Sequence, residues 1–289
     1  MHYQGNIFRP PSEADSILLQ VTTGCSHNKC TFCGMYKGSR FAIKDEAIIQ
    51  ADLEFASRHC HRQDRLFLCD GDALIIPQKR LVALLTDIRR KLPWLTRVGS
   101  YANTRAINSK TVAELTELRE LGLSIAYMGL ESGDDLTLQE INKGADSRRM
   151  IEMAAKIRQA GIKLSITVLL GIAQARRSAI HAAETGRVLT AIDPEYVGVL
   201  SLMPTPGTPL HAAWTRGEFE LLDADAMLVE LRQMLAATEL TDGYFHANHA
   251  SNYLPIKARL PRDKESTLAL IDQALSGRIG LKPEYLRGL

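Results

Sequence analysis

The sequence predicts an α/β fold, a partial (β/α)6 barrel of the TIM type with parallel strands. Short apolar runs alternate six times with amphipathic stretches, which is typical of parallel βαβ units. The runs are continuously apolar, as in strands buried on both faces of a sheet. Eight such units close a barrel, so six predict an open one. The predicted strands are residues 16–23, 65–69, 96–101, 123–130, 163–171 and 195–202.

Helices are predicted between these strands. Segment 108–122 begins with Asn108 or Ser109 as a capping residue, segment 146–161 begins with Asp146, and each segment ends at a glycine. Such residues are favoured at the two ends of helices because they satisfy or relieve the unpaired backbone groups there. The segments therefore fit the crossover helices of βαβ units.

Composition limits the possible partners. The chain has 289 residues, 45% of them hydrophobic, and a net charge of +2 from 35 basic and 33 acidic residues. This balance gives no strong attraction to nucleic acid or to an anionic membrane surface. No signal-peptide pattern is visible, and no apolar run approaches the roughly 20 residues that span a bilayer. We therefore expect a cytoplasmic protein without membrane contact, in which thiols stay reduced.

One main domain is predicted, with an extension at each end. We expect an N-terminal extension at 1–14, the barrel at 15–255 and a C-terminal helical extension at 256–289. Within the last of these, a helix at 264–275 is expected to pack on the open side of the barrel. Segment 243–264 is rich in histidine, asparagine and serine, which compete with backbone hydrogen bonding, so it is interpreted as a loop.

Three cysteines, Cys25, Cys30 and Cys33, follow the first predicted strand within nine positions. In barrels of this kind the chemistry lies at the C-terminal ends of the strands. Iron–sulfur clusters are held by cysteine thiolates, usually four, so three would leave one iron of a four-iron cluster open to another ligand. In a zinc site, His27 would be the fourth ligand, but structural zinc sites usually pair two distant ligand groups.

Two further cysteines, Cys60 and Cys69, stand alone in the sequence. An isolated cysteine in or beside an apolar strand usually behaves as a small buried apolar residue. We therefore leave both outside the predicted metal site.

The three cysteines, with Phe32 just before the third, resemble the radical S-adenosylmethionine (SAM) superfamily over about residues 14–255. The core is similar to the coproporphyrinogen-oxidase-like and methylthiotransferase-like domains of that family. Its cysteines are usually separated by three and then two residues, whereas here the spacing is Cys-x4-Cys-x2-Cys. Loops absorb an extra residue at low cost. The sequence therefore fits an uncharacterised branch.

The resemblance implies two cofactors, a [4Fe-4S] cluster and SAM. In the family, the amino and carboxylate groups of SAM chelate the open iron, and the reduced cluster cleaves SAM to a 5′-deoxyadenosyl radical. It implies an oxygen-sensitive enzyme that takes electrons from a reductant such as flavodoxin or ferredoxin. The radical would abstract hydrogen from a small-molecule or peptide substrate.

The resemblance also implies polar contacts to SAM. Asp70, Gly71 and Asp72 follow the second strand and resemble the family's Gly-Gly-Glu segment, which meets the amino group of the substrate. In this chain we assign them to cofactor binding. Glu131 and Lys143 stand where the coproporphyrinogen-oxidase-like branch has a glutamine and an arginine. A lysine there would neutralise the methionyl carboxylate as a point charge, without the two-pronged contact of arginine.

Further residues are placed by the same resemblance around the nucleoside. Tyr101 and Asn103 end the third strand, near the expected ribose, and Gly171 ends the fifth, under the expected adenine. Phe32 is expected to pack near the adenine. The Pro-Gly-Thr-Pro string at 206–209 recurs in the family at the turn after the sixth strand.

Substrate contacts or the final hydrogen donor are assigned to Tyr101, His246 and His249. The two histidines lie within a seven-residue stretch with two asparagines and a serine. They could instead contact a second metal, or the stretch could be a surface loop with capping asparagines.

Three other functions remain open at this point. A non-catalytic iron–sulfur or zinc protein would use the cysteines for structure or electron transfer. An RNA-modifying radical SAM enzyme would carry an extra basic domain, for which this chain has neither the length nor the charge. A porphyrin-precursor decarboxylase would carry a long C-terminal domain that is not seen in this sequence.

Overall fold

The computed structural model describes residues 1–288 and contains one eight-stranded sheet in the order β1-β4-β5-β6-β7-β8-β9-β10. The strands up to β9 pair in parallel where their registers are defined, and β10 is antiparallel to β9. The order is linear, with β1 and β10 at its ends, as in an open barrel. The predicted α/β class is therefore confirmed. The strands are β1 (Ile17–Gln20), β4 (Arg65–Cys69), β5 (Arg97–Tyr101), β6 (Leu123–Glu131), β7 (Lys163–Leu170), β8 (Tyr196–Ser201), β9 (Gly243–His246) and β10 (Lys257–Leu260).

The chain forms two compact units. Unit 1 comprises Met1–Asn28, Met35–Met128 and Glu152–Leu164, and unit 2 comprises Lys29–Gly34, Gly129–Ile151 and the chain from Ser165 onward. The division crosses β6, β7 and helix α6 (Ser147–Gln159). The predicted boundaries after residues 14 and 255 stay predictions.

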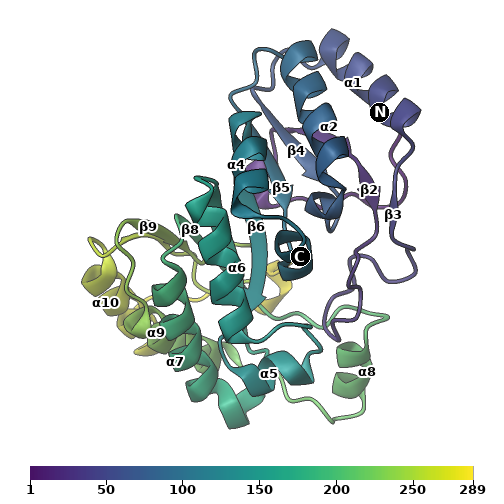
Figure 1. The fold of residues 1–289 in the computed structure, drawn as a ribbon. Helices are drawn as coiled ribbons and strands as arrows, with labels where there is room; N and C mark the ends of the chain where they lie inside the picture. Colours follow the sequence, from purple (N-terminus) through teal and green to yellow (C-terminus); the bar gives the residue numbers. More distant parts are fainter. Residues whose placement is uncertain (289) are drawn as a thin grey trace. The chain divides into compact units, whose positions relative to one another are not determined.

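Unit 1 is built on β1, β4, β5 and most of β6. Helix α2 packs against α1 and α4, and α1 packs against β1 (Figure 1). The apolar stripe of α2 faces inward, with Leu81, Leu84, Leu85 and Ile88 all buried. The remaining elements of this unit are η1 (Pro11–Glu13), β2 (Thr22–Thr23), β3 (Ala42–Ile43), α1 (Glu46–His59), η2 (Ala73–Ile75), α2 (Gln78–Lys91), α3 (Thr104–Asn108) and α4 (Val112–Glu120).

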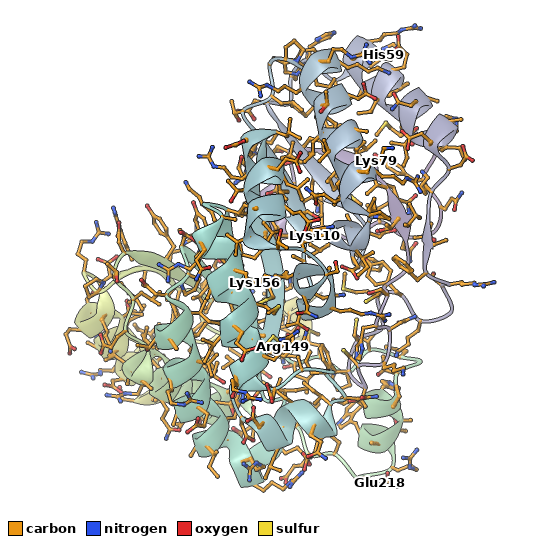
Figure 2. All side chains as sticks on the ribbon, viewed as in Figure 1. His59, Lys79, Lys110, Arg149, Lys156 and Glu218 are labelled. Carbon is orange, nitrogen blue, oxygen red and sulfur yellow. The ribbon has the colours of Figure 1, made fainter. Side chains whose placement is uncertain are left out.

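The predicted cap of the 108–122 helix is wrong. Asn108 is the last residue of α3, and the cap of α4 is Thr111, which forms a reciprocal capping box with Glu114. The turn between α3 and α4 is closed by Lys156 of α6, which donates to the carbonyl oxygens of Ile107 (3.1 Å) and Lys110 (Figure 2). The turn thus interrupts a stretch that sequence periodicity alone reads as one helix.

The cap predicted for α6 is confirmed, because the Asp146 carboxylate accepts the backbone N–H of Arg149 at 2.7 Å. The two isolated cysteines differ in exposure. Cys69 is fully buried at the end of β4, where burial raises the pKa of its thiol, and Cys60 is half-buried.

Unit 2 is built on most of β7 with β8, β9 and β10. Helix α7 packs against α9, and α10 packs against α9 and β10 (Figure 1). The predicted helix at 264–275 is confirmed as α10. The helices of this unit are α5 (Asp135–Glu140), α7 (Gln174–Ile192), α8 (Pro209–Thr215), α9 (Ala224–Ala237), α10 (Lys264–Leu275) and η3 (Glu284–Leu286).

The segment interpreted as a loop at 243–264 contains two strands. β9 pairs in parallel with β8, Tyr196 opposite Tyr244, and β10 pairs with β9. The loop is therefore confined to residues 247–256 and the short turn at 261–263. These four-residue strands owe their conformation to their partners, since neither has a long apolar run. None of the helices formed by residues 1–288 has the length and apolar character that crossing a membrane requires.

Candidate active site

The cysteine segment Lys29–Gly34 belongs to unit 2 and is tied there by its backbone. The N–H of Thr31 donates to the carbonyl oxygen of Ile141 (2.9 Å), and the N–H of Leu210 donates to the carbonyl oxygen of Thr31 (2.9 Å). Cys30 and Cys33 lie on either side of this anchored residue and are both partly exposed. The end of α5 and the beginning of α8 therefore fix the segment that presents these thiols.

Two neighbours of Cys33 show how closely the segment packs. Phe32 contacts an apolar cluster, and a Cβ atom at Gly34 would lie only 2.5 Å from Cγ2 of Thr205. Position 34 therefore needs glycine, and the turn containing the Pro-Gly-Thr-Pro string contacts the cysteine segment. The cluster around Phe32 is formed by Leu138, Ile141, Leu169, Ile172, Leu202 and Leu210.

Cys25 belongs to unit 1, where it lies against the turn after β4. A Cβ atom at Gly71 would lie 3.0 Å from Cβ of Cys25 and 2.7 Å from the ring of Tyr36. The adjacent Asp70 is buried, and its carboxylate accepts from the side-chain amide of Gln20 (2.7 Å) and the hydroxyl of Tyr36 (3.4 Å). Burial raises the pKa of Asp70 despite these bonds. Gly71 and Asp70 thus shape the support of Cys25.

Asp72 is fully buried, and only one of its two carboxylate oxygens accepts hydrogen bonds from the described residues. Ser26 and Asn103 both donate to its Oδ2, the latter at 2.8 Å. Its Oδ1 has no hydrogen-bond partner among the described residues. Burial raises the pKa of this carboxyl to about 6, against the two hydrogen bonds that lower it. A buried carboxylate oxygen without a donor can accept one from a ligand.

The polar residues that follow β5 have different surroundings. Asn103 caps α3, its Oδ1 accepting the N–H of Ala106 (2.8 Å) while its amide reaches Asp72. The ring of Tyr101 packs edge-on against Phe67, with centroids 5.0 Å apart. The structure therefore brings Asn103 and Asp72 together, whereas Tyr101 packs with aromatic rings.

Glu131 and Lys143 form an ion pair in unit 2, with Nζ 2.9 Å from Oε1. Burial lowers the pKa of Lys143, but Glu131, Cys30 and Cys33 outweigh it and raise that pKa overall. Glu131 itself has a left-handed backbone (φ 65°), and a Cβ atom at Gly129 would lie 2.2 Å from its carboxylate. Lys143 of this pair thus interacts electrostatically with Cys30 and Cys33.

Gly171 directly follows β7 with φ 79°, and a Cβ atom there would lie 2.9 Å from Cε of Met227 on α9. Its N–H donates to Oε1 of Glu230 (2.7 Å). The left-handed backbone favours glycine at this position, whether or not a flat ring also approaches it.

A buried polar network that the sequence did not reveal joins this turn to the end of β6. Glu230 and His181 are both fully buried, with Nε2 of the histidine 3.5 Å from the carboxylate. Ser178 donates to Glu230 (2.5 Å), and Ser132 contacts Nδ1 of His181 (2.8 Å). Burial lowers the pKa of His181 to about 4 and raises that of Glu230 to about 7. The one sequence feature that could have indicated this network is Glu230, a charged residue among the buried apolar residues of α9.

Glu230→Gln is expected to remove a pH dependence of stability. The pKa of Glu230 is raised from 4.5 to about 7 in the folded state. Its contribution to stability is therefore complete below pH 4.5 and is lost as the pH rises through 7. By pH 8 the variant should gain up to about 3 kcal/mol relative to the wild type. Urea unfolding at pH 5, 6.5 and 8 measures this, with exposed Glu265→Gln as the control. Parallel curves for wild type and Glu230→Gln would contradict it.

The two histidines lie on different elements of unit 2. His246 is the last residue of β9, beside Tyr244, and His249 lies in the following loop. Nδ1 of His249 accepts the N–H of Ser251 (3.2 Å). Burial first, and then a nearby lysine, lowers the pKa of each imidazole.

The loop of His249 is bound tightly to β8. Asn252 is 2% exposed; its Oδ1 accepts from Ser201 (2.8 Å) and its amide donates to the carbonyl of Val199 (2.7 Å). The alternative of a surface loop with capping asparagines does not describe Asn252. Asn248, in contrast, is exposed.

Among the described residues, no three His, Cys, Asp or Glu side chains are grouped as ligands of one metal ion. A single ion requires ligands that converge on one point, whereas in a four-iron cluster each cysteine bonds a different iron. The three cysteines of the loop are partly exposed. This donor set suits a cluster.

The model of the radical SAM superfamily matches residues 19–180, more than half of the chain. The chain belongs to the radical SAM superfamily. Radical SAM enzymes use a [4Fe-4S] cluster and SAM, act on a substrate and need an external reductant.

Curated relatives of this radical SAM enzyme are distant. Biotin synthase of Halorhodospira halophila is 23% identical over 218 residues, which cover 74% of this chain and 64% of that protein. The uncharacterized protein MJ0486 of Methanocaldococcus jannaschii is 23% identical over 86% of this chain and 75% of its own length. The chain thus spans just under two thirds of the first of these.

Solved structures show the same fold. Methylornithine synthase (PylB) has a TM-score of 0.54 at 18% identity, covering 78% of this chain and 63% of that one. Coproporphyrinogen III oxidase (HemN) from Escherichia coli has a TM-score of 0.54 at 15% identity, covering 76% and 51%. At such identities the likeness concerns the fold alone and identifies no substrate.

Proposed function

We propose that Cys25, Cys30 and Cys33 hold the [4Fe-4S] cluster and that Lys143 binds the carboxylate of SAM beside it. The observation that carries this is the charged group formed in unit 2, where Lys143 pairs with Glu131 and interacts electrostatically with Cys30 and Cys33. SAM chelated to a cluster iron would bring its carboxylate close to the thiolates. A lysine in that position supplies the compensating charge.

Asp72 is the proposed partner of the SAM amino group. Its Oδ1 is buried and has no hydrogen-bond partner among residues 1–288, while Ser26 and Asn103 occupy Oδ2. An ammonium donates up to three hydrogen bonds and would satisfy this oxygen with opposite charge. Asp70 and Gly71 act by supporting Cys25, since the oxygens of Asp70 are already bonded.

When bound, the reduced cluster and SAM supply the 5′-deoxyadenosyl radical that abstracts hydrogen from the substrate. The residues of the chain bind, orient and exclude water around it. Phe32 and Gly171 are the proposed neighbours of the adenine, and Tyr101, His246 and His249 the proposed substrate contacts. The substrate is a small molecule or a peptide. The comparisons do not favour the non-catalytic or RNA-modifying alternatives.

An anaerobic assay tests this function. The protein is reconstituted with iron and sulfide, reduced with dithionite and mixed with SAM, and 5′-deoxyadenosine is measured by mass spectrometry. We expect the nucleoside to form slowly without substrate and to be absent in a Cys33→Ala protein. A reconstituted four-iron protein that neither binds nor cleaves SAM would overturn the proposal.

Lys143→Met is expected to weaken SAM binding by about 10- to 100-fold, the loss of a hydrogen bond to a charged group. Methionine keeps the apolar stem of the side chain and removes only the ammonium. Equilibrium dialysis of the reconstituted protein gives the affinity, and iron content shows that the cluster is retained. The matched control is Lys264→Met, which removes a buried ammonium on α10 that donates to Thr238 and Glu239. Equal affinities of the Lys143 and Lys264 variants would contradict the role.

A further inference from the structure

The C-terminal segment, residues 282–288, is fastened to the loop that carries His249. The N–H of Lys282 donates to the carbonyl oxygen of Tyr253 (2.8 Å), and its Nζ donates to that of Ala250 (3.1 Å). The N–H of Gly288 also donates to Ala250 (3.3 Å). Between these bonds Tyr285 is 82% exposed, so the segment crosses the surface of unit 2.

Arg287, which belongs to this segment, holds it against the loop through a buried side chain. Its side chain is 4% exposed, and its guanidinium lies 4.0 Å from the centre of the Tyr253 ring. Nε donates to the carbonyl oxygen of Ser251 (2.6 Å), while Nη1 donates to the Tyr253 hydroxyl (2.5 Å) and to Glu284 (2.7 Å). The one N–H of Nε and the two of Nη1 thus donate to these partners, which leaves the two of Nη2.

The remaining nitrogen of the Arg287 guanidinium, Nη2, is buried and makes no hydrogen bond to residues 1–288. Guanidinium stays protonated in proteins and carries donors only. Burying charged donors without a partner costs free energy, so buried charges are normally paired. The natural partner of Nη2 is an oxygen atom with negative charge.

The position of Arg287 places this donor where substrates bind in such folds. Ser251, whose carbonyl it contacts, accepts the N–H of Ser201 through its hydroxyl (3.1 Å). Ser201 ends β8, and ligands of parallel α/β sheets bind outside the carboxyl ends of the strands. The site therefore lies at the functional edge of the sheet, next to His249.

We propose that Arg287 binds an oxyanion, a carboxylate or phosphate group, of the substrate of this enzyme. Lys282 adds positive charge, and Glu284, 68% exposed, offsets part of it at Nη1 only. The ligand reaches Nη2 when the segment 282–288 lifts, and it holds the segment in place once bound. That the oxyanion belongs to the substrate rests on the proposed function; binding of the oxyanion does not.

Thermal unfolding of the full chain without cofactors tests the site. The probes are sodium acetate and sodium phosphate at 50 mM. Acetamide serves as the uncharged analogue of acetate. Sodium chloride is added so that all samples have the same ionic strength. We expect acetate or phosphate to raise the midpoint by about 2–4 °C, as ligand linkage predicts for millimolar affinity. Phosphate alone would indicate a phosphorylated substrate, and acetate alone a carboxylic acid.

Arg287→Gln should abolish the shift, with exposed Arg278→Gln as the control. Arg287→Lys, which keeps the charge but has fewer donors, serves if the glutamine variant does not fold, and it should reduce the shift at least by half. An equal shift with acetamide, or an unchanged shift in Arg287→Gln, would overturn the proposal.

The two proposals fail separately. Binding of acetate or phosphate is measured on the cofactor-free chain, whereas SAM cleavage is measured on the reconstituted wild type without substrate. A wild type that neither binds nor cleaves SAM would speak against the proposed function and leave the oxyanion result standing. A thermal shift that Arg287→Gln does not remove would overturn the oxyanion site and leave the proposed function standing.

Discussion

Cys30→Ala is expected to lose both cluster iron and SAM cleavage while keeping its fold. With two thiolates left, a four-iron cluster would lack a protein ligand at two irons. The fold should survive because the segment is held by backbone bonds of Thr31 to Ile141 and Leu210, which the substitution leaves intact. Iron and sulfide content, the visible spectrum and circular dichroism measure the three parts of this result.

The matched control for Cys30→Ala is Cys60→Ala, a half-buried cysteine outside the loop. It should bind about as much iron as the wild type and cleave SAM at the same rate. If the Cys30 variant retained a four-iron spectrum, its role as a ligand would be excluded. If both variants lost the cluster, the effect would lie in reconstitution and not in the loop.

Asp72→Asn should make the cofactor-free protein more stable and bind SAM more weakly. Burial raises the pKa of Asp72 from 3.8 to about 6, so its charge at neutral pH opposes folding. Its stabilising contribution is complete below pH 3.8 and lost as the pH rises through 6. Asparagine keeps an acceptor for Ser26 and Asn103 but carries no charge. At pH 8 we expect a gain of about 2–3 kcal/mol in unfolding free energy.

SAM affinity should change in the opposite direction, falling about 10- to 100-fold in Asp72→Asn with the loss of a charged hydrogen bond. In the wild type, affinity should also fall as the pH drops below 6 and Asp72 is protonated. Urea unfolding and equilibrium dialysis across pH 5–8 measure both, with the exposed Asp225→Asn as control. A variant that binds SAM as the wild type does would leave Asp72 a purely structural carboxyl.

Most of the barrel could be predicted because its strands carry their own signal. Apolar runs such as 65–69 are buried on both faces of the sheet, and the structure places β4 at those residues. β9 and β10 could not be predicted, since each has four residues and becomes a strand through pairing with a neighbour. The cap at Thr111 was missed because Asn108 belongs to a short helix that only tertiary contacts stabilise.

Residues of the candidate site could be singled out from the sequence where they follow the ends of predicted strands. Contacts between residues that are far apart in the sequence could not be predicted. Glu131 and Lys143 were singled out as SAM contacts, which stays a prediction; the ion pair that they form with each other was not predicted. Ser26 joins Asp72 across 46 residues, and His181 approaches Glu230 across 49. Neither partner belongs to a local motif, so no spacing rule indicated them. The role proposed for Arg287 likewise depends on its contacts with Ser251 and Tyr253, which are distant in the sequence.

The antiparallel last strand has a consequence for the behaviour of the protein in concentrated solution. β10 ends the sheet, but the backbone N–H of Arg259 donates to the Asp263 carboxylate (2.8 Å) and its carbonyl oxygen accepts the N–H of Asp263 (2.8 Å). These groups are therefore not available to the edge of another sheet. Lys257 and Arg259 place charge on this strand, and Pro255 and Pro261 flank it without N–H donors. Edge-to-edge association would have to bury these charges, so β10 is a poor template for aggregation.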